Sequence, residues 1–355
     1  MKTKQLENVL DRLGISVNCN QPDSVLVNSP DFYKKVLKSG SLGFGEAYVD
    51  GLWDTQDLSA LFCKITSIDY RNILYKKNIG LLFLILRHKL FNYQSISLSK
   101  KSARKHYNIG NDLYMKMLDP ELNYSCAYWK EADSLEMAQQ HKLDLICRKM
   151  NLAPGMRVLD VGCGWGSFAR FAARNYGVEV VGITLSEEQL VHCKERHEGL
   201  SVEYILKDYR KLESNQFDRI VSIGMFEHVG LKNFKTYFKK LHHLLKDEGL
   251  FLLHTIGSKK STIKSDPWIT RYIFPNGKLP SIAQTAKASE AYFCFEDLHN
   301  IGSDYDKTLM AWNDNCLENR EMIETNYGKD FFRLWTYYLQ SCAGAFRSRS
   351  LHLWQ

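Results

Sequence analysis

The chain has 355 residues, of which 45% are hydrophobic, and a formal net charge of +7 at pH 7. This composition excludes a disordered chain, and the length allows one large domain or two ordinary ones. Nine cysteines, with no N-terminal stretch that resembles a signal peptide, indicate free thiols in a reducing cytoplasm. The positive charge permits an anionic partner but does not distinguish nucleic acid from phospholipid.

Residues 1–95 mostly show apolar side chains at helical spacing, which predicts a small, mainly helical domain. We expect a short strand at 24–28 and a glycine- and aromatic-rich turn between helices at 41–53. The longest apolar run, 79–86, has basic residues on both sides. It is shorter than the roughly 20 residues that span a bilayer, so it is either a buried helix or a segment at a membrane surface. We therefore predict no transmembrane segment.

A linker rich in Ser, Lys and Arg is expected at 96–105, and a larger domain at 106–355. That domain should open with a helix that starts within 107–114, capped by Asn111 or Asp112, and ends at Pro120. A polar, aromatic loop at 123–129 and an amphipathic helix at 135–150 follow. Both should lie over the mouth of a pocket.

From residue 156 onward the pattern alternates between strands and helices. Strands are expected at 157–161, 179–183, 202–206, 217–222 and 250–255, with helices between them that include 186–196 and 233–245. This rhythm predicts an α/β, Rossmann-like fold with a parallel sheet and a ligand at the carboxyl ends of its strands. A long insertion at 258–279 is typical of a lid. A further strand near 293–300 and a long helix through Tyr337 and Tyr338 should complete the chain.

The first of these strands ends in a turn with three glycines at alternate positions, Gly162, Gly164 and Gly166. Glycine lets a backbone approach a ligand closely, and the helix that follows offers free N–H groups. The dinucleotide fingerprint has a different spacing, Gly-x-Gly-x-x-Gly, and an acidic residue about 20 positions later. Here the next strand ends at Thr184 instead. The turn therefore favours S-adenosylmethionine over NAD, although glycines of this kind also serve packing.

Chemically active side chains lie at or just past the expected strand ends or in a facing loop: Cys126, Glu227, His254 and Tyr305. Taken singly, Cys126 could be a buried thiol, His254 a core histidine and Tyr305 part of an aromatic wall. Glu227 follows an apolar strand closely, so we expect its carboxylate to face the ligand cleft.

The chain resembles the bacterial cyclopropane-fatty-acyl-phospholipid synthases over essentially its whole length. The motifs that carry this resemblance are Tyr124-Ser-Cys-Ala-Tyr-Trp129, Val158-Leu-Asp-Val-Gly-Cys-Gly-Trp-Gly166, Thr184-Leu-Ser-Glu-Glu-Gln189, Gly224-Met-Phe-Glu-His-Val-Gly230, Leu252-Leu-His-Thr-Ile-Gly257, Tyr272-Ile-Phe-Pro-Asn-Gly277 and Gly40-Ser-Leu-Gly-Phe-Gly-Glu46. The shorter mycolic-acid cyclopropane synthases share the catalytic half but not the N-terminal domain. The resemblance implies a class I S-adenosylmethionine methyltransferase sheet.

The implied reaction transfers a methyl group to the cis double bond of a phospholipid acyl chain. The resulting carbocation must lose a proton to close a cyclopropane ring, so the site must be dry. The resemblance implies a bound bicarbonate as the base, held by Cys126, Glu227, His254, Tyr305 and the backbone near Ile256. Aromatic faces could stabilise the cation, and the candidates are Tyr305, Phe274 and Trp268.

The resemblance also assigns S-adenosylmethionine binding to Tyr124, Ser125, Gly162, Cys163, Gly164, Trp165, Gly166, Thr184, Leu185, Gln189, Asp208, Tyr209 and Ile223. In this set Thr184 and Gln189 would hydrogen-bond the ribose, and Asp208 would lie at the adenine edge. Ordinary core packing is the alternative for Tyr209 and Ile223.

The expected partner is unsaturated phospholipid at the inner face of the cytoplasmic membrane, with no nucleic acid and no metal, and a homodimer is expected. The alternatives are a methyltransferase of the same fold acting on another lipid or a small molecule, and a non-catalytic lipid-binding protein. The family usually continues for one more strand beyond Gln355, so the chain is either trimmed or has a shorter last strand.

Overall fold

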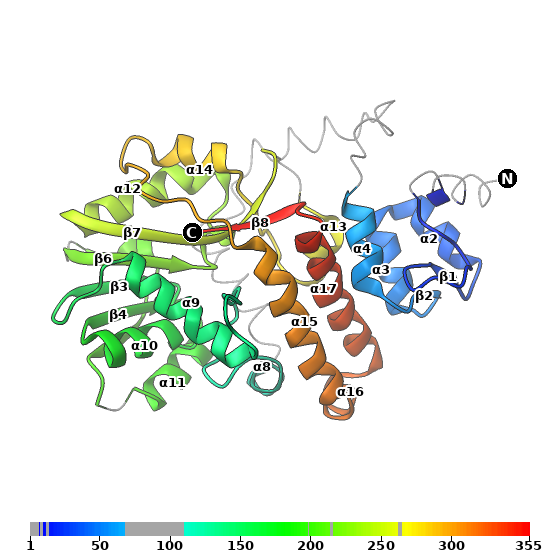
Figure 1. The fold of residues 1–355 in the computed structure, drawn as a ribbon, viewed down its shortest axis with the longest axis horizontal. Coiled ribbons are helices and arrows are strands. Elements are labelled where there is room, and N and C mark those ends of the chain that lie inside the picture. The colour runs from blue at the N-terminus through cyan, green and yellow to red at the C-terminus, as the bar shows by residue number, and fades with distance from the viewer. Residues whose placement is uncertain are drawn as a thin grey trace. The chain divides into compact units, whose positions relative to one another are not determined.

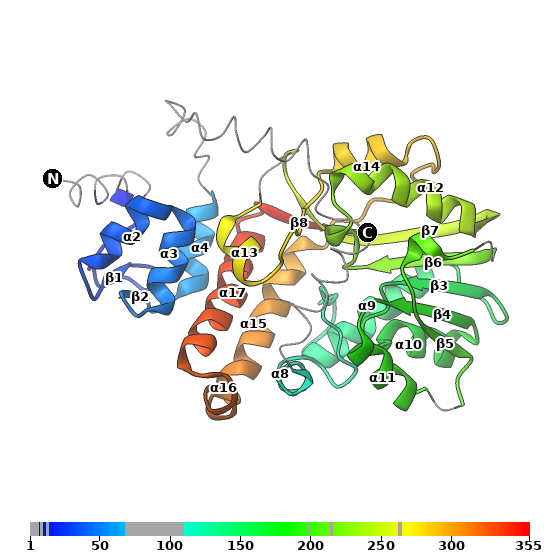
Figure 2. The ribbon, with the colours of Figure 1, turned by 180° about the vertical axis from the view of Figure 1, so that it is seen from behind.

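The computed structural model describes residues 7, 10, 11, 14–67, 110–197, 199–213, 216–261 and 265–355. The chain divides into two compact units (Figures 1 and 2). The first unit comprises 1–87, 264–275 and 305–351, and the second comprises 88–263, 276–304 and 352–355. The expected linker at 96–105 and the apolar run at 79–86 lie outside the described residues.

The second unit is built on a six-stranded sheet with the order β5-β4-β3-β6-β7-β8. The strands are β3 (Arg157–Val161), β4 (Glu179–Thr184), β5 (Val202–Leu206), β6 (Phe217–Ile223), β7 (Leu245–Ser258) and β8 (Leu351–Trp354). Strands β3 and β4, β4 and β5, β3 and β6, and β6 and β7 pair in parallel. The predicted parallel α/β sheet is confirmed. Strand β3 lies where the strand order reverses, which is where such sheets bind ligands.

Helices cover both faces of this sheet because side chains alternate along its strands. Leu159 of β3 joins an apolar cluster with α12 (Phe234–Leu244). The preceding residue, Val158, joins a second cluster with α9 (Leu135–Lys149) and α10 (Ser167–Tyr176). Figure 1 shows α12 and α14 (Ile282–Ser289) on one side of the sheet, and α9, α10 and α11 (Glu187–Glu195) on the other.

Two local expectations in the second unit were wrong. Helix α8 (Asn111–Met117) begins after its N-cap Gly110, and no side chain of the described residues caps it. The segment 293–300 is not a strand; only Asn300 forms a β-bridge, to Trp354. Phe295 and Leu298 are about half exposed, at 53% and 49%. A strand needs backbone pairing with a neighbouring strand along its length, and among the described residues this segment is paired only at Asn300.

The first unit is mainly helical. It contains α2 (Asp31–Ser39), α3 (Ser41–Val49), α4 (Leu58–Ser67), α13 (Pro267–Tyr272), α16 (Arg320–Tyr327), α17 (Lys329–Arg347) and most of α15 (Gly302–Glu318). The short strands β1 (Leu26–Val27) and β2 (Trp53–Asp54) pair antiparallel. The segment near the N-terminus thus shares a compact unit with residues from the second half of the chain, and the division into functional domains stays a prediction. Within the described ranges no helix is long and apolar enough to cross a membrane.

The glycine-rich turn expected at 41–53 is mostly the helix α3, so that expectation was wrong. Glycine disfavours a helix by about 1 kcal/mol relative to alanine. At Gly45, however, an added Cβ would lie 2.4 Å from the indole of Trp268, a side chain of α13 that is only 1% exposed. The glycine therefore serves close packing of a buried aromatic ring.

Candidate active site

The turn after β3 is built from glycines that no other residue can replace without strain. Gly162, Gly164 and Gly166 have φ values of 85°, 55° and 81°. An added Cβ at Gly162 would lie 2.8 Å from Cγ of Met225, and one at Gly166 would lie 2.4 Å from the hydroxyl of Tyr204. Gly166 is also the N-cap of α10, whose first N–H groups lie behind the turn. This geometry suits close approach of an anionic or polar ligand.

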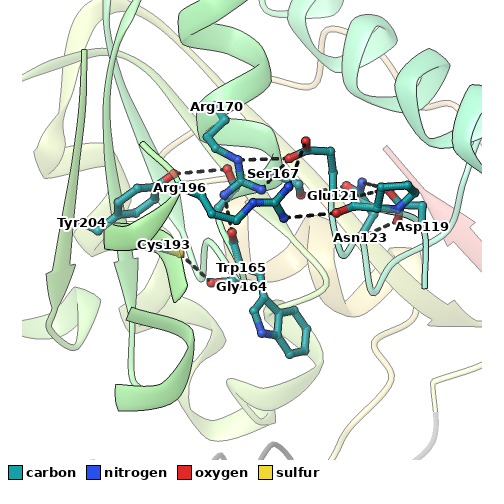
Figure 3. Close-up of polar contacts among 12 residues, drawn as sticks. Asp119, Glu121, Asn123, Gly164, Trp165, Ser167, Arg170, Cys193, Arg196 and Tyr204 are labelled. Atoms are coloured by element: carbon teal, nitrogen blue, oxygen red, sulfur yellow. Dashed lines mark hydrogen bonds and ion pairs between the residues drawn. The ribbon is translucent and has the colours of Figure 1, made fainter. Parts of the chain in front are cut away.

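Arg170 ties the glycine turn to the loop that precedes the 123–129 segment (Figure 3). Its guanidinium is 2% exposed and donates to the Trp165 carbonyl at 2.6 Å and to Glu121 Oε2 at 2.6 and 3.0 Å. Ser167, on the same helix, donates to Asn123 Oδ1 at 2.8 Å. The turn and the loop, which carry different proposed cofactor residues, are therefore held together by polar contacts.

A buried lysine on α9 also contacts this loop. Lys142 is 1% exposed, and its ammonium donates to Asn123 Oδ1 at 2.9 Å and to Ser125 Oγ at 3.1 Å. Burial lowers the pKa of Lys142 to about 8, although the negative charges of nearby acidic groups act to raise it. Burial likewise raises the pKa of Asp160, at the end of β3, to about 7, and the charge of Lys142 opposes that rise.

Sequence reasoning missed Lys142 and Arg170. A signal for Lys142 was present, because the helix expected at 135–150 carries this charged residue on the same stripe as the buried Ala138 and Ile146. A lysine on an apolar stripe is rarely fully buried unless it is paired. Arg170 offers no comparable signal, since arginine within a surface helix is common.

Aromatic rings continue the link between the loop and the turn. The ring of Tyr124 lies 5.3 Å from that of Tyr114, on α8, and the Tyr114 ring lies 4.9 Å from Trp165.

Two buried thiols lie at the glycine turn. The Cys193 thiol donates to the Gly164 carbonyl at 3.5 Å. The thiol of Cys163 interacts with Cys193 and is buried, which raises its pKa well above the usual value, so it is a neutral thiol.

The residues at the end of β4 bind each other. The Thr184 hydroxyl donates to Gln189 Oε1 at 2.8 Å and accepts from the Ser186 N–H at 3.1 Å. Leu185 between them is partly buried. The Thr184 hydroxyl proton and the Gln189 carbonyl oxygen are therefore used within the protein, so a hydrogen bond donated from this pair to a ligand would come from the amide nitrogen of Gln189.

Asp208 follows β5 and caps the short 3-10 helix η1 (Tyr209–Lys211). Its carboxylate accepts from the Arg210 guanidinium at 2.7 and 2.8 Å. Burial alone would raise the pKa of Asp208, but the bonds and charge of Arg210 lower it, so the group is ionised.

Tyr209 packs edge-on against Tyr237 within the apolar cluster of α12, and Ile223 is the last residue of β6. Tyr209 is therefore part of the packed core, which is the alternative to cofactor binding that the sequence left open.

Glu227 lies just past β6, in the 3-10 helix η2 (Phe226–His228). Its Oε1 accepts from the Ile256 N–H of β7 at 2.7 Å. Its Oε2 is buried and makes no hydrogen bond within the described part of the chain. Burial raises the pKa of Glu227 to about 7, and the bond from Ile256 only partly offsets this. The carboxyl is thus poised between its protonated and ionised forms at neutral pH.

His254 lies on β7, two residues before Ile256 and in register with Ile223 of β6. The side chain is 1% exposed, and Nδ1 lies 3.0 Å from the amide nitrogen of Gln355. Nε2 is buried and has no hydrogen-bond partner among the described residues. Burial lowers the pKa of His254 well below its usual value, and the charges of Lys142 and Lys149 lower it further. The imidazole is therefore neutral.

Cys126 is fully buried, and its thiol donates to the Ala127 carbonyl at 3.2 Å. Tyr305 belongs to the first unit, where its ring packs against Phe346 at 4.6 Å between centroids. The structure thus brings Glu227 to the β7 segment that carries His254. The participation of Cys126 and Tyr305 in one base site stays a prediction.

Comparison with known proteins identifies the family to which the chain belongs. The family model for mycolic acid cyclopropane synthetase matches residues 94–355. The cyclopropane-fatty-acyl-phospholipid synthase of Escherichia coli (strain K12) is 53% identical over 350 residues, which cover 98% of this chain and 90% of that protein. The chain belongs to the cyclopropane synthase family. The resemblance inferred from the motifs is confirmed.

Solved cyclopropane synthases share the fold. The cyclopropane synthase MmaA2 from Mycobacterium tuberculosis has a TM-score of 0.69 and 31% identity, over 72% of this chain and 96% of its own. A mycolic acid cyclopropane synthase, CmaA1, complexed with SAH and CTAB has a TM-score of 0.68 and 33% identity over the same shares. The predicted methyltransferase fold class and enzyme class are therefore confirmed.

Proposed function

We propose that this protein transfers the methyl group of S-adenosylmethionine to the cis double bond of an unsaturated phospholipid acyl chain and closes a cyclopropane ring. The observation that carries the substrate assignment is the extent of the match. The E. coli phospholipid enzyme matches 98% of the chain, including its N-terminal part. Cyclopropane mycolic acid synthase 2 of M. tuberculosis (strain CDC 1551 / Oshkosh) is 36% identical and matches 70% of this chain. The alternative is a methyltransferase of the same fold with a different lipid or small-molecule acceptor.

For the methyl donor, we assign the glycine turn from Gly162 to Gly166, together with the loop residues Tyr124 and Ser125. An added Cβ at Gly164 would meet no atom of the described residues within 4 Å, which leaves room for a ligand there. Contacts of Arg170 and Ser167 join the turn to the loop, and Lys142 holds Ser125 within the loop. The remaining cofactor residues follow the ends of three strands: Thr184, Leu185, Gln189, Asp208, Tyr209 and Ile223.

The chemistry requires a base in a site that excludes water, since water would trap the carbocation. We assign Glu227, His254, Cys126 and Tyr305 as the residues that would hold a bicarbonate ion. The buried Oε2 of Glu227 and Nε2 of His254 lack partners within the described residues, which fits a small ligand with both donor and acceptor atoms. When bound, bicarbonate would supply the base that accepts the ring-closing proton. A protonated Glu227 carboxyl would avoid repulsion between two anions.

The enzyme would act at the inner face of the cytoplasmic membrane as a peripheral homodimer. In this proposal residues 1–95 serve lipid interaction or dimerisation, 96–105 form a linker, and 258–279 act as a lid of the catalytic range 106–355. The membrane-facing role is supported by the positive net charge of +7, which favours anionic lipid surfaces.

The test of the proposed function is a product assay. The protein is incubated with vesicles of unsaturated phospholipid and S-adenosylmethionine, and the acyl chains are analysed by mass spectrometry. We expect chains heavier by one methylene that carry a cyclopropane ring. Methylation of a soluble acceptor alone would reject the phospholipid assignment.

Two controls separate the base site from cofactor binding. Glu227→Ala removes the carboxyl that would hold the bicarbonate and should lower turnover by about 10²–10⁴-fold, the usual contribution of a base to proton-transfer catalysis, while calorimetric affinity for S-adenosylmethionine stays unchanged. Equal losses of turnover and affinity would contradict the assignment of Glu227. Thorough removal of bicarbonate should also lower activity, and unchanged activity would argue against a bound ion.

A further inference from the structure

The side-chain amide of Gln355 is the partner of His254 inside the second unit. Its nitrogen lies 3.0 Å from Nδ1 of the imidazole, and Gln355 is 8% exposed. The backbone of Gln355 is held in place by two hydrogen bonds with the backbone of His299, each 2.9 Å long. The amide therefore approaches the imidazole from a fixed backbone position.

A neutral imidazole carries one proton, and the hydrogen bond at one nitrogen decides which nitrogen carries it. His254 is neutral because burial, with Lys142 and Lys149 nearby, disfavours its charged form. With its amide nitrogen facing Nδ1, as the structure places it, Gln355 donates, so Nδ1 accepts and the proton lies on Nε2. That Nε2 is the buried atom without a partner among the described residues.

We propose that Gln355 is a positioning residue that holds His254 in the Nε2-protonated tautomer, so that the imidazole presents an N–H donor to the oxyanion of the base site. This inference rests on the proposed function, which supplies the oxyanion. The opposite tautomer would direct a lone pair at an anion and repel it. Gln355 acts only through His254 and contacts no reacting atom.

Two substitutions separate this role from simple packing. Gln355→Glu keeps the shape but replaces the donor by an acceptor, which should draw the proton from Nε2 to Nδ1. Gln355→Met keeps a similar volume and removes the partner, so both tautomers should be populated. Gln56→Glu adds the same charge at an exposed position of the first unit and serves as the matched control.

The measurement is ¹⁵N NMR of histidine-labelled protein, in which protonated and unprotonated ring nitrogens have well-separated shifts. The His254 signals are assigned from their loss in His254→Gln. We expect Nε2 to be protonated in the unaltered protein and in Gln56→Glu, and Nδ1 to be protonated in Gln355→Glu. Persistence of the Nε2 proton in Gln355→Glu, or a proton on Nδ1 in the unaltered protein, would overturn the proposal.

Turnover gives the functional readout. We expect Gln355→Glu to lower turnover and bicarbonate stimulation by about 10–100-fold, the range seen when the group that orients a metal-binding histidine is removed. Affinity for S-adenosylmethionine should not change. Full turnover in Gln355→Glu despite a switched tautomer would also overturn the proposal. Because the NMR readout needs no turnover, failure of the tautomer prediction is distinguishable from failure of the unaltered protein to make cyclopropane product.

Discussion

Burial changes the acid–base behaviour of individual side chains in the second unit. Glu227 and Asp160 both have pKa values raised to about 7, whereas Lys142 has one lowered to about 8. In each case loss of solvation is the largest cause, and it disfavours the charged form. Carboxyls of this kind can donate a hydrogen bond near neutral pH, which an ordinary surface carboxylate cannot.

The raised pKa of Glu227 predicts a specific dependence of stability on pH. The folded-state pKa of about 7 exceeds the reference value of 4.5, so the folded protein binds more protons than the unfolded chain between these values. The contribution of Glu227 to stability is therefore present below about pH 4.5 and is lost as pH rises towards 7. Glu227→Gln removes this titration because the amide resembles the protonated acid.

Relative to Glu227→Gln, we expect the unaltered protein to lose on the order of 3 kcal/mol of unfolding free energy across that range, at 1.36 kcal/mol per pKa unit. Urea denaturation at a series of pH values measures the difference. Glu290→Gln, at an exposed position, should follow the unaltered protein. A constant difference between the Glu227→Gln and unaltered curves would contradict the shifted pKa.

At the scale of elements, the loop at 119–126 and the start of α10 depend on each other through polar contacts rather than a shared strand or helix. Arg170 contacts both segments, and its guanidinium is almost fully buried (Figure 3). Without it, the buried Trp165 carbonyl would lose a strong donor. The partner Glu121 is 37% exposed and could regain water, which limits the loss.

We therefore expect Arg170→Met to lower the unfolding free energy by about 1–3 kcal/mol, the cost of an unsatisfied buried polar group. It should also weaken S-adenosylmethionine binding, because the turn and the loop would no longer be joined by the guanidinium. Urea denaturation and calorimetry measure the two effects. Arg148→Met removes an exposed ion pair with Asp144 and should cost less than about 0.5 kcal/mol. Similar effects from both substitutions would contradict the role of Arg170.

At the scale of the whole molecule, the net charge of +7 bears on how the protein meets its proposed substrate. An enzyme that acts on phospholipid must reach a membrane surface, and the described residues contain no helix that crosses one. Attraction between a cationic protein and anionic headgroups is long-ranged only at low salt, since the Debye length falls from about 10 Å at 0.1 M to about 3 Å at 1 M.

We expect co-sedimentation with vesicles that contain phosphatidylglycerol to exceed that with pure phosphatidylcholine vesicles. Salt should remove most of this excess, because it screens the exposed charges. The assay uses the full chain with vesicles of equal size and acyl composition. Equal binding to both vesicle types at low salt would show that charge does not direct the protein to membranes.

Much of the second unit could be predicted from the sequence because its signals are local. The strand expected at 157–161 coincides with β3, and that expected at 202–206 coincides with β5. Short apolar runs separated by helical periodicity are enough to predict buried parallel strands. Gly162, Gly164 and Gly166 could likewise be assigned to a tight turn after this first strand, because their need for positive φ is a property of the turn itself. Their role in binding a ligand stays a proposal.

Only the tertiary structure decided which distant residues support those segments. The helix α3 contains glycines that locally favour a turn, and within this helix Gly45 leaves room for the ring of Trp268, more than 200 positions along the chain. The partners of Lys142, Arg170 and Gln355 could not be assigned from the sequence, because only folding brings them together; Gln355 and His254 are separated by 101 positions. Local pattern determined the sheet, the glycine turn and the family motifs. Long-range packing decided the protonation states and the contacts that orient the site, since burial and hydrogen-bond partners exist only in the folded chain.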